Sequence, residues 1–276
     1  MIEIQFKKKM MEENIKECKF GVYRNLPNMG SIKCFYNENY NIAPVYEYCS
    51  VEVQKIHALD VAFQCIKNEY LPVVVNFVTY EFTGGNMQSG NGIRDELINI
   101  RTSFNKTNEP TMNFNHYPLR DSEVVYTKIC HIIRNSNLQL LYPNQVCKIS
   151  LITAPIKKEI ELINNNLTLS DYILMKTTME TIFQTASTHG NDVIILNDCG
   201  ITMNNFPIDD IIRIINGCIY KYGHLFKYVI VAILATRQSE IAYCNKFNGD
   251  LIKPQALFYE GKNIFNIAKF STMDSR

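Results

Sequence analysis

The residues best suited to chemistry lie in a glycine-rich segment that is followed directly by acidic side chains. Within residues 83–93 the glycines are Gly84, Gly85, Gly90 and Gly92. Glycine lets a backbone adopt positive φ angles and approach a ligand closely, and the N–H groups of a helix that begins after such a loop attract anions. The neighbouring carboxyl groups of Asp95 and Glu96 are candidates for general acid or base catalysis.

The same segment also has an ordinary structural explanation. A glycine-rich connection is often only a loop, and the helix dipole by itself favours acidic residues in a first helical turn. The glycine spacing differs from the Rossmann fingerprint, and the GK[ST] triplet of a Walker A loop is absent. From the residues alone, both interpretations stay open.

A second loop of similar character runs from Asp198 to Pro207. It follows an apolar run that predicts a buried strand, and ligands of open α/β sheets bind outside the carboxyl ends of strands. Its Gly200, Asn204 and Asn205 are typical of tight turns, so the composition of this loop taken alone favours a structural role over a functional one. The histidines show no metal-ligand spacing, and the sequence predicts neither a metal site nor a cofactor.

The elements that would position these loops alternate between strands and helices. The predicted strands are 31–36, 72–77, 124–133, 147–153, 193–197 and 228–234, with a further possible strand at 256–259. The predicted helices cover 57–68, 93–104, a segment capped by Ser170 and ended by Gly190, and a segment that begins at Pro207. Such alternation predicts an α/β fold with a mixed, mostly parallel sheet covered by helices.

Composition sets the class of protein. The chain has 276 residues, 46% of them hydrophobic and 20% charged, with a net charge of +1. We expect one domain over 1–276, made of an N-terminal extension (about 1–48), a core (about 49–235) and a C-terminal segment (236–276). The small net charge predicts no steering toward sequence-specific nucleic acid or a membrane. The nine cysteines form no CxxC pair, and no signal peptide or membrane helix is evident, so we expect a cytoplasmic or nuclear protein.

Taken in order, these segments resemble the microbial-type poly(ADP-ribose) glycohydrolase family. In that family a strand ending in Asn-Phe-Ala precedes a GGG loop and a QEE triplet that opens a helix. Here the corresponding residues are Asn76-Phe77, Gly84-Gly85-Asn86 and Arg94-Asp95-Glu96. The strands VVYTKICHIIRN and VCKISLITAPI and the loop that ends at Asn205 and Pro207 continue the resemblance, which covers about residues 15–235.

The resemblance implies a macrodomain-like three-layer α/β/α fold and an activity toward ADP-ribose. It implies hydrolysis of ribose–ribose O-glycosidic bonds in poly(ADP-ribose), with Glu96 as acid and base and Asp95 orienting the ribose. The implied ligand-binding residues are Asn76, Phe77, Gly84, Gly85, Asn86, Gly90, Arg94, Gly200, Asn204, Asn205 and Phe206. The implied partner is ADP-ribose or its polymer, free or attached to protein.

Two alternatives to the hydrolase stay open, and departures from the family pattern favour the first of them. Asn86 places a side chain where the family has its third glycine, and Arg94 places a cation near Glu96, which lowers a carboxyl pKa. One alternative is therefore an ADP-ribose-binding module with impaired catalysis. The other is a structural or interaction protein that uses the same fold with a closed cleft.

Overall fold

The computed structural model of the chain describes residues 2–27, 30–78, 93–104, 116, 118–157, 159–197, 199, 201 and 205–252, with the backbone only at 2–4, 7–8 and 93–96. Its centre is a seven-stranded sheet in the order β1-β4-β5-β3-β8-β9-β2. The strands are β1 (Ser31–Cys34), β2 (Ser50–Gln54), β3 (Pro72–Val78), β4 (Val124–Ile132), β5 (Cys147–Pro155), β8 (Val193–Leu196) and β9 (Tyr228–Ala232). Strands β5, β3, β8, β9 and β2 pair in parallel, whereas β4 runs antiparallel to both β1 and β5.

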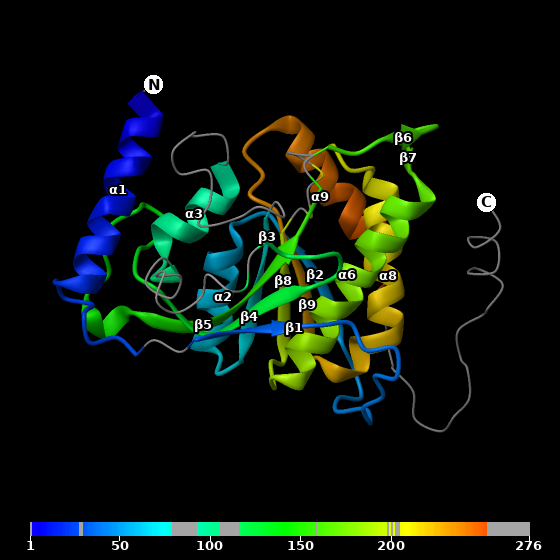
Figure 1. Ribbon diagram of the computed structural model, residues 1–276, viewed down its shortest axis with the longest axis horizontal. Coiled ribbons are helices and arrows are strands. Elements are labelled where there is room, and N and C mark those ends of the chain that lie inside the picture. The colour runs from blue at the N-terminus through cyan, green and yellow to red at the C-terminus, as the bar shows by residue number, and fades with distance from the viewer. Residues whose placement is uncertain are drawn as a thin grey trace.

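Helices cover both faces of this sheet (Figure 1). They are α1 (Ile2–Lys19), α2 (Ala58–Lys67), α3 (Ile93–Arg101), α6 (Leu169–Thr188), α8 (Ile208–Tyr222) and α9 (Gln238–Asp250). Helices α6, α8 and α9 enclose one hydrophobic core with the sheet, and α2 and α3 enclose the other. The hairpin β6 (Leu162–Ile163) and β7 (Asn166–Leu167) precedes α6, and short 3₁₀ turns lie at Pro143–Gln145 and Gly223–Leu225.

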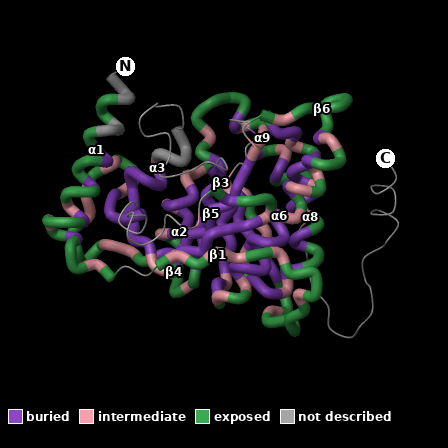
Figure 2. Tube along the Cα trace, viewed as in Figure 1, coloured by how far each residue is buried: buried purple, intermediate pink, exposed green. Residues whose placement is uncertain are grey.

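The middle of the sheet is buried on both faces (Figure 2). Every residue of β3 and every residue of β8 is buried, as expected of parallel strands with helices on both sides. Alternate residues of β3 separate into the two cores: Val75 contributes to the α6–α8 side, and Val74 contributes to the α2–α3 side. The three-layer fold expected from the sequence is therefore confirmed.

The predicted strands are all present except 256–259, which lies outside the described residues. The predicted position of the α6 cap is wrong: Thr168, not Ser170, accepts the hydrogen bond from the N–H of Asp171 at 3.2 Å. The prediction also missed α1, β2 and α9. Pro207 stands at the N-cap of α8, one residue before the helix begins.

No described helix has both the length and the apolar composition that crossing a bilayer requires. None of the nine cysteines forms a disulfide bond. Within the described ranges, no cluster of His, Cys, Asp and Glu side chains is arranged to hold a metal ion.

A buried carboxylate joins the connection after β1 to α6 and α8. Glu180 accepts hydrogen bonds from Tyr36 Oη at 3.1 Å, Tyr222 Oη at 2.9 Å and Lys221 Nζ at 2.7 Å. Burial acts to raise the pKa of Glu180, but these donors and the Lys221 charge outweigh it, so the pKa is lowered. Because the folded-state pKa is depressed, this carboxylate stabilises the fold above the unfolded-state pKa, and its contribution disappears as the pH falls through the folded-state pKa.

We therefore expect Glu180→Gln to lower the melting temperature most near neutral pH. The difference from wild type should begin to shrink as the pH falls below about 5.5 and should keep shrinking through the lowered folded-state pKa, because the wild-type carboxylate becomes protonated over that range. Thermal unfolding across this pH range measures the effect. The exposed Glu161→Gln is the control and should change the melting temperature little. A constant difference for Glu180→Gln would contradict the assignment.

Candidate functional site

The carboxyl ends of the parallel strands meet at one edge of the sheet. Strand β3 ends here at Val78, before the segment that precedes α3 in the chain, and β8 ends here at Leu196, before the segment that precedes α8. These are the two loops that the sequence singled out. The topology thus places the ends of β3 and β8, which directly precede the two candidate loops in the chain, at the edge where open α/β folds bind ligands.

The predicted site residues divide into three groups. Gly84, Gly85, Asn86, Gly90, Gly200 and Asn204 lie outside the described residues. The backbone of Arg94, Asp95 and Glu96 forms the first turn of α3, as the sequence predicted, while the structure does not describe their side chains. Asn76, Phe77, Asn205 and Phe206 are described in full.

Asn76 is fully buried near the end of β3, between Val74 and Val78 on the face that α2 and α3 cover. Phe77 points the other way, into the core beneath α6. Neither Oδ1 nor Nδ2 of Asn76 has a hydrogen-bond partner in the part of the chain that the structure describes. A buried polar group without a partner costs about 1–3 kcal/mol, so such groups are rare in folded proteins.

The neighbouring strand holds a second such group. Thr153 of β5 is the Cα partner of Asn76, and its Oγ1, also fully buried, has no hydrogen-bond partner among the described residues. Residues paired in register across parallel strands project to the same face of the sheet, so the amide and the hydroxyl lie side by side. We call these two residues the Asn76–Thr153 pair. Sequence reasoning missed Thr153, because only the register of β5 against β3 places it beside Asn76.

Two of the described residues in the second loop have positive φ. Cys199 has φ 51° and Asn205 has φ 55°. The side-chain oxygen of Asn197 accepts a hydrogen bond from the N–H of Cys199 at 3.0 Å, which closes a tight turn directly after β8. Asn205 therefore adopts the conformation expected of Asn in a tight turn. Cys199 is fully buried, and its Sγ approaches the Asn197 carbonyl oxygen at 3.3 Å.

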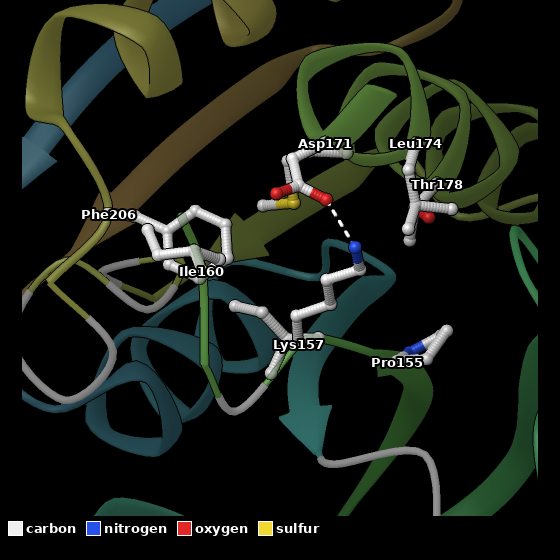
Figure 3. Close-up of a pocket in the computed structure, with 9 residues that line it drawn as sticks. Pro155, Lys157, Ile160, Asp171, Leu174, Thr178 and Phe206 are labelled. Carbon is white, nitrogen blue, oxygen red and sulfur yellow. Dashed lines mark hydrogen bonds and ion pairs between the residues drawn. The ribbon is translucent and has the colours of Figure 1, made fainter. Parts of the chain in front are cut away.

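Phe206 borders a small pocket beyond the end of β5 (Figure 3). The lining residues are Pro155, Ile156, Lys157, Ile160, Asp171, Leu174, Met175, Thr178 and Phe206. The Lys157 amine forms an ion pair across the pocket with the buried carboxylate of Asp171 in the first turn of α6. The walls are otherwise mainly apolar.

His189 does not belong to this edge. It caps the carboxyl end of α6 and stacks on the Tyr126 ring, with centroids 3.9 Å apart and planes within 3°. Burial, and secondarily the Lys128 charge, lowers the pKa of His189, so the neutral imidazole is favoured. The Cys34 thiol lies 3.9 Å from Nε2 of His189, and burial raises the pKa of this thiol. The thiol and the imidazole therefore lack the charge-activated character of a catalytic dyad.

Comparison with known proteins gives one consistent result. No protein-family model and no curated protein sequence matches the chain. The structure of poly(ADP-ribose) glycohydrolase from Thermomonospora curvata superposes with a TM-score of 0.68 and 14% identity, covering 90% of this chain and 100% of that one. The same enzyme bound to the inhibitor ADP-HPD gives a TM-score of 0.67 at 14% identity, covering 89% and 99% of the two chains.

A third structure is poly(ADP-ribose) glycohydrolase from Deinococcus radiodurans in complex with ADP-ribose. Its TM-score is 0.62 at 14% identity, and the match covers 73% of this chain and 84% of that one. The chain therefore has the fold of the bacterial poly(ADP-ribose) glycohydrolases.

Proposed function

We propose that the protein is a hydrolase that releases ADP-ribose by cleaving ribose–ribose O-glycosidic bonds. The fold supports this, because the solved structures that it resembles are poly(ADP-ribose) glycohydrolases, one of them in complex with ADP-ribose. The observation that carries the proposal is the Asn76–Thr153 pair: two buried polar side chains without partners among the described residues, at the ligand-binding edge of this fold.

The chemistry of the pair favours a sugar over a phosphate or a cation. An amide and a hydroxyl together offer neutral donors and acceptors, but no charge. A phosphate would call for cationic side chains or a set of N–H groups, and a cation would call for carboxylates. The two hydroxyls of a ribose each donate and accept, and they complement such a pair. We assign the pair to the ribose next to the bond that is cleaved.

Glu96, in the first turn of α3, is the proposed acid and base. Its carboxylic acid protonates the oxygen of the leaving ribose as the C–O bond breaks, and an oxocarbenium-like centre forms. The resulting carboxylate then removes a proton from the attacking water, which restores the acid and yields ADP-ribose. Asp95 orients the ribose through its hydroxyls. The backbone N–H groups of the two loops, with Arg94, hold the diphosphate.

A second candidate is an ADP-ribose-binding module without turnover. The observation that favours it is the identity of residue 94: Arg94 puts a cation where the family pattern has an uncharged glutamine, and a cation close to a carboxyl group disfavours its acid form. In this case the cleft and the Asn76–Thr153 pair would keep their binding role. Only the chemical step would be lost.

Titration calorimetry with ADP-ribose, run beside an assay for ADP-ribose release from poly(ADP-ribose), tests the proposal. Binding together with release supports the hydrolase. Binding without release would favour the binding module. Absence of both would leave a protein that uses the fold for structure or interaction, and the proposal would be rejected.

A further inference from the structure

The carboxyl-terminal end of α3 is held by hydrogen bonds from outside the helix. The last four carbonyl groups of an α-helix have no partner in its own ladder. In α3 the first of them, on Ile98, accepts from Thr102 Oγ1 at 2.6 Å. The last, on Arg101, accepts from the N–H groups of Ile133 at 2.9 Å and Arg134 at 3.2 Å, just beyond β4.

The two carbonyl groups between them are bound by a single side chain of α1. Nδ2 of Asn14 donates to the carbonyl oxygen of Ile100, and it lies 3.3 Å from that of Asn99. Asn14 is only 1% exposed, so water does not replace these bonds. Met10 and Met11 of α1 pack against Ile100 beside it. Helix α1 thus contacts α3 at the end opposite to the acidic residues (Figure 1).

A buried guanidinium fixes the orientation of the Asn14 amide. Nε of Arg134 donates to Oδ1 of Asn14 at 2.8 Å, which leaves Nδ2 pointing at α3. The other nitrogens of Arg134 bind the Leu138 carbonyl oxygen at 2.7 Å and the Glu13 carboxylate at 2.6 Å. Arg134 is 3% exposed, whereas the Glu13 side chain is 50% exposed. Glu13 and Asn14 therefore share Arg134, but only Asn14 reaches α3.

A second guanidinium anchors the same end of α3 to α2. Arg101, buried in the last turn of α3, forms a two-point ion pair with the Asp60 carboxylate at 3.1 and 2.5 Å. The end of α3 is thereby fixed to α1, to α2 and to the end of β4. A helix of this length is about 13 Å long, so a tilt of about 5° at the fixed end moves the opposite end by about 1 Å.

We propose that Asn14 is a positioning residue that sets the place of the acidic first turn of α3. The inference rests on the proposed function, because that function assigns the chemistry to Asp95 and Glu96. Asn14 touches neither substrate nor carboxylate in this scheme. It acts through the two carbonyl groups at the far end of the helix, and displacements of about 1 Å at a reacting group cost up to about 100-fold in rate.

The test uses Asn14→Asp in the full-length chain. The aspartate keeps an oxygen for Arg134, but it has no amide donor and places negative charge against the carbonyl end of the helix. We expect kcat for ADP-ribose release to fall about fivefold, with KM and the Kd for ADP-ribose within about twofold of wild type. Hydrogen exchange of residues 97–104 should become faster. Asn14→Ala, which removes the amide without burying a charge, has the same expected result.

Glu13→Gln is the matched control, since it alters the other partner of Arg134 and leaves the α3 carbonyls bound. It should change neither kcat nor the exchange of residues 97–104. The inference is overturned if both Asn14 variants keep wild-type kcat, or if kcat and KM change for Glu13→Gln as much as for Asn14→Asp. If wild type itself releases no ADP-ribose, the proposed function has failed separately. Hydrogen exchange then tests the inference by itself. Unchanged protection of residues 97–104 in both Asn14 variants overturns the inference.

Discussion

Glu96→Gln is expected to lower the release of ADP-ribose from poly(ADP-ribose) about a thousandfold, with the Kd for ADP-ribose within about threefold of wild type. Glutamine has nearly the size of glutamate and keeps a hydrogen-bonding carbonyl, but it carries no proton that it can give to a leaving oxygen. The loss should therefore fall on kcat. Single-turnover release and calorimetry on the same preparations separate the two effects.

Asp95→Asn is the informative comparison, because it changes the neighbouring carboxylate of the same helical turn. If Asp95 only orients the ribose, its variant should lose about tenfold in kcat/KM, with a larger share in KM than for Glu96→Gln. Equal losses for both variants, all in kcat, would mean that the two carboxylates act as one unit. Undiminished release by Glu96→Gln would refute the assignment of the acid.

Thr153→Val should make the protein more stable and the ligand weaker. Valine has the shape of threonine, suits a strand and replaces a buried hydroxyl that has no partner among the described residues. Removing such a group should stabilise the fold by about 1 kcal/mol. That corresponds to a melting temperature about 2–4 °C higher. If the hydroxyl binds a ribose, the Kd for ADP-ribose should rise about tenfold, the upper end for one hydrogen bond.

Thr127→Val is the matched control on the adjacent strand. Thr127 is also fully buried, but its Oγ1 lies 2.7 Å from Oγ of Ser31, so it has a partner in the protein. Its variant should lower the melting temperature and leave the Kd unchanged. The opposite signs of the two stability changes distinguish a hydroxyl kept for a ligand from one kept for the fold. A lower melting temperature and an unchanged Kd for Thr153→Val would show that its hydroxyl is structural.

Local sequence patterns were sufficient to predict the elements whose burial follows from their own run or spacing of apolar residues. The run at 72–77 predicted the buried central strand β3, and the apolar spacing after Pro207 predicted α8. Helix α1 was missed because its residues are mostly polar, and it is placed by contacts with Ile100 and by the Asn14 amide. Strand β2 is five residues long and half exposed, so its pattern is weak.

In the candidate site too, residues in continuous motifs could be predicted, whereas residues placed by long-range contacts could not. Asn76 and the acidic first turn of α3 could be predicted, because their motifs are continuous in the chain. Thr153 could not, since its importance comes from the register that sets it opposite Asn76. Asn14 lies outside the segment that resembles the known family, and its contacts join residues far apart in the sequence. Long-range pairing of this kind leaves no periodic trace in the chain.

The order of strands in the sheet also determines when each strand can find its partner while the chain is being synthesised. Strand β2 leaves the ribosome early, yet its partner in the sheet is β9, the last strand described. At about 5–20 residues per second, on the order of ten seconds or more pass before β9 is available. During that interval Val51 and Val53, which end packed against the α6–α8 core, lie on a strand that has no partner strand to pair with. Nascent chains should therefore depend on chaperones until β9 emerges, and a break in the chain before β9 should leave β2 open to aggregation.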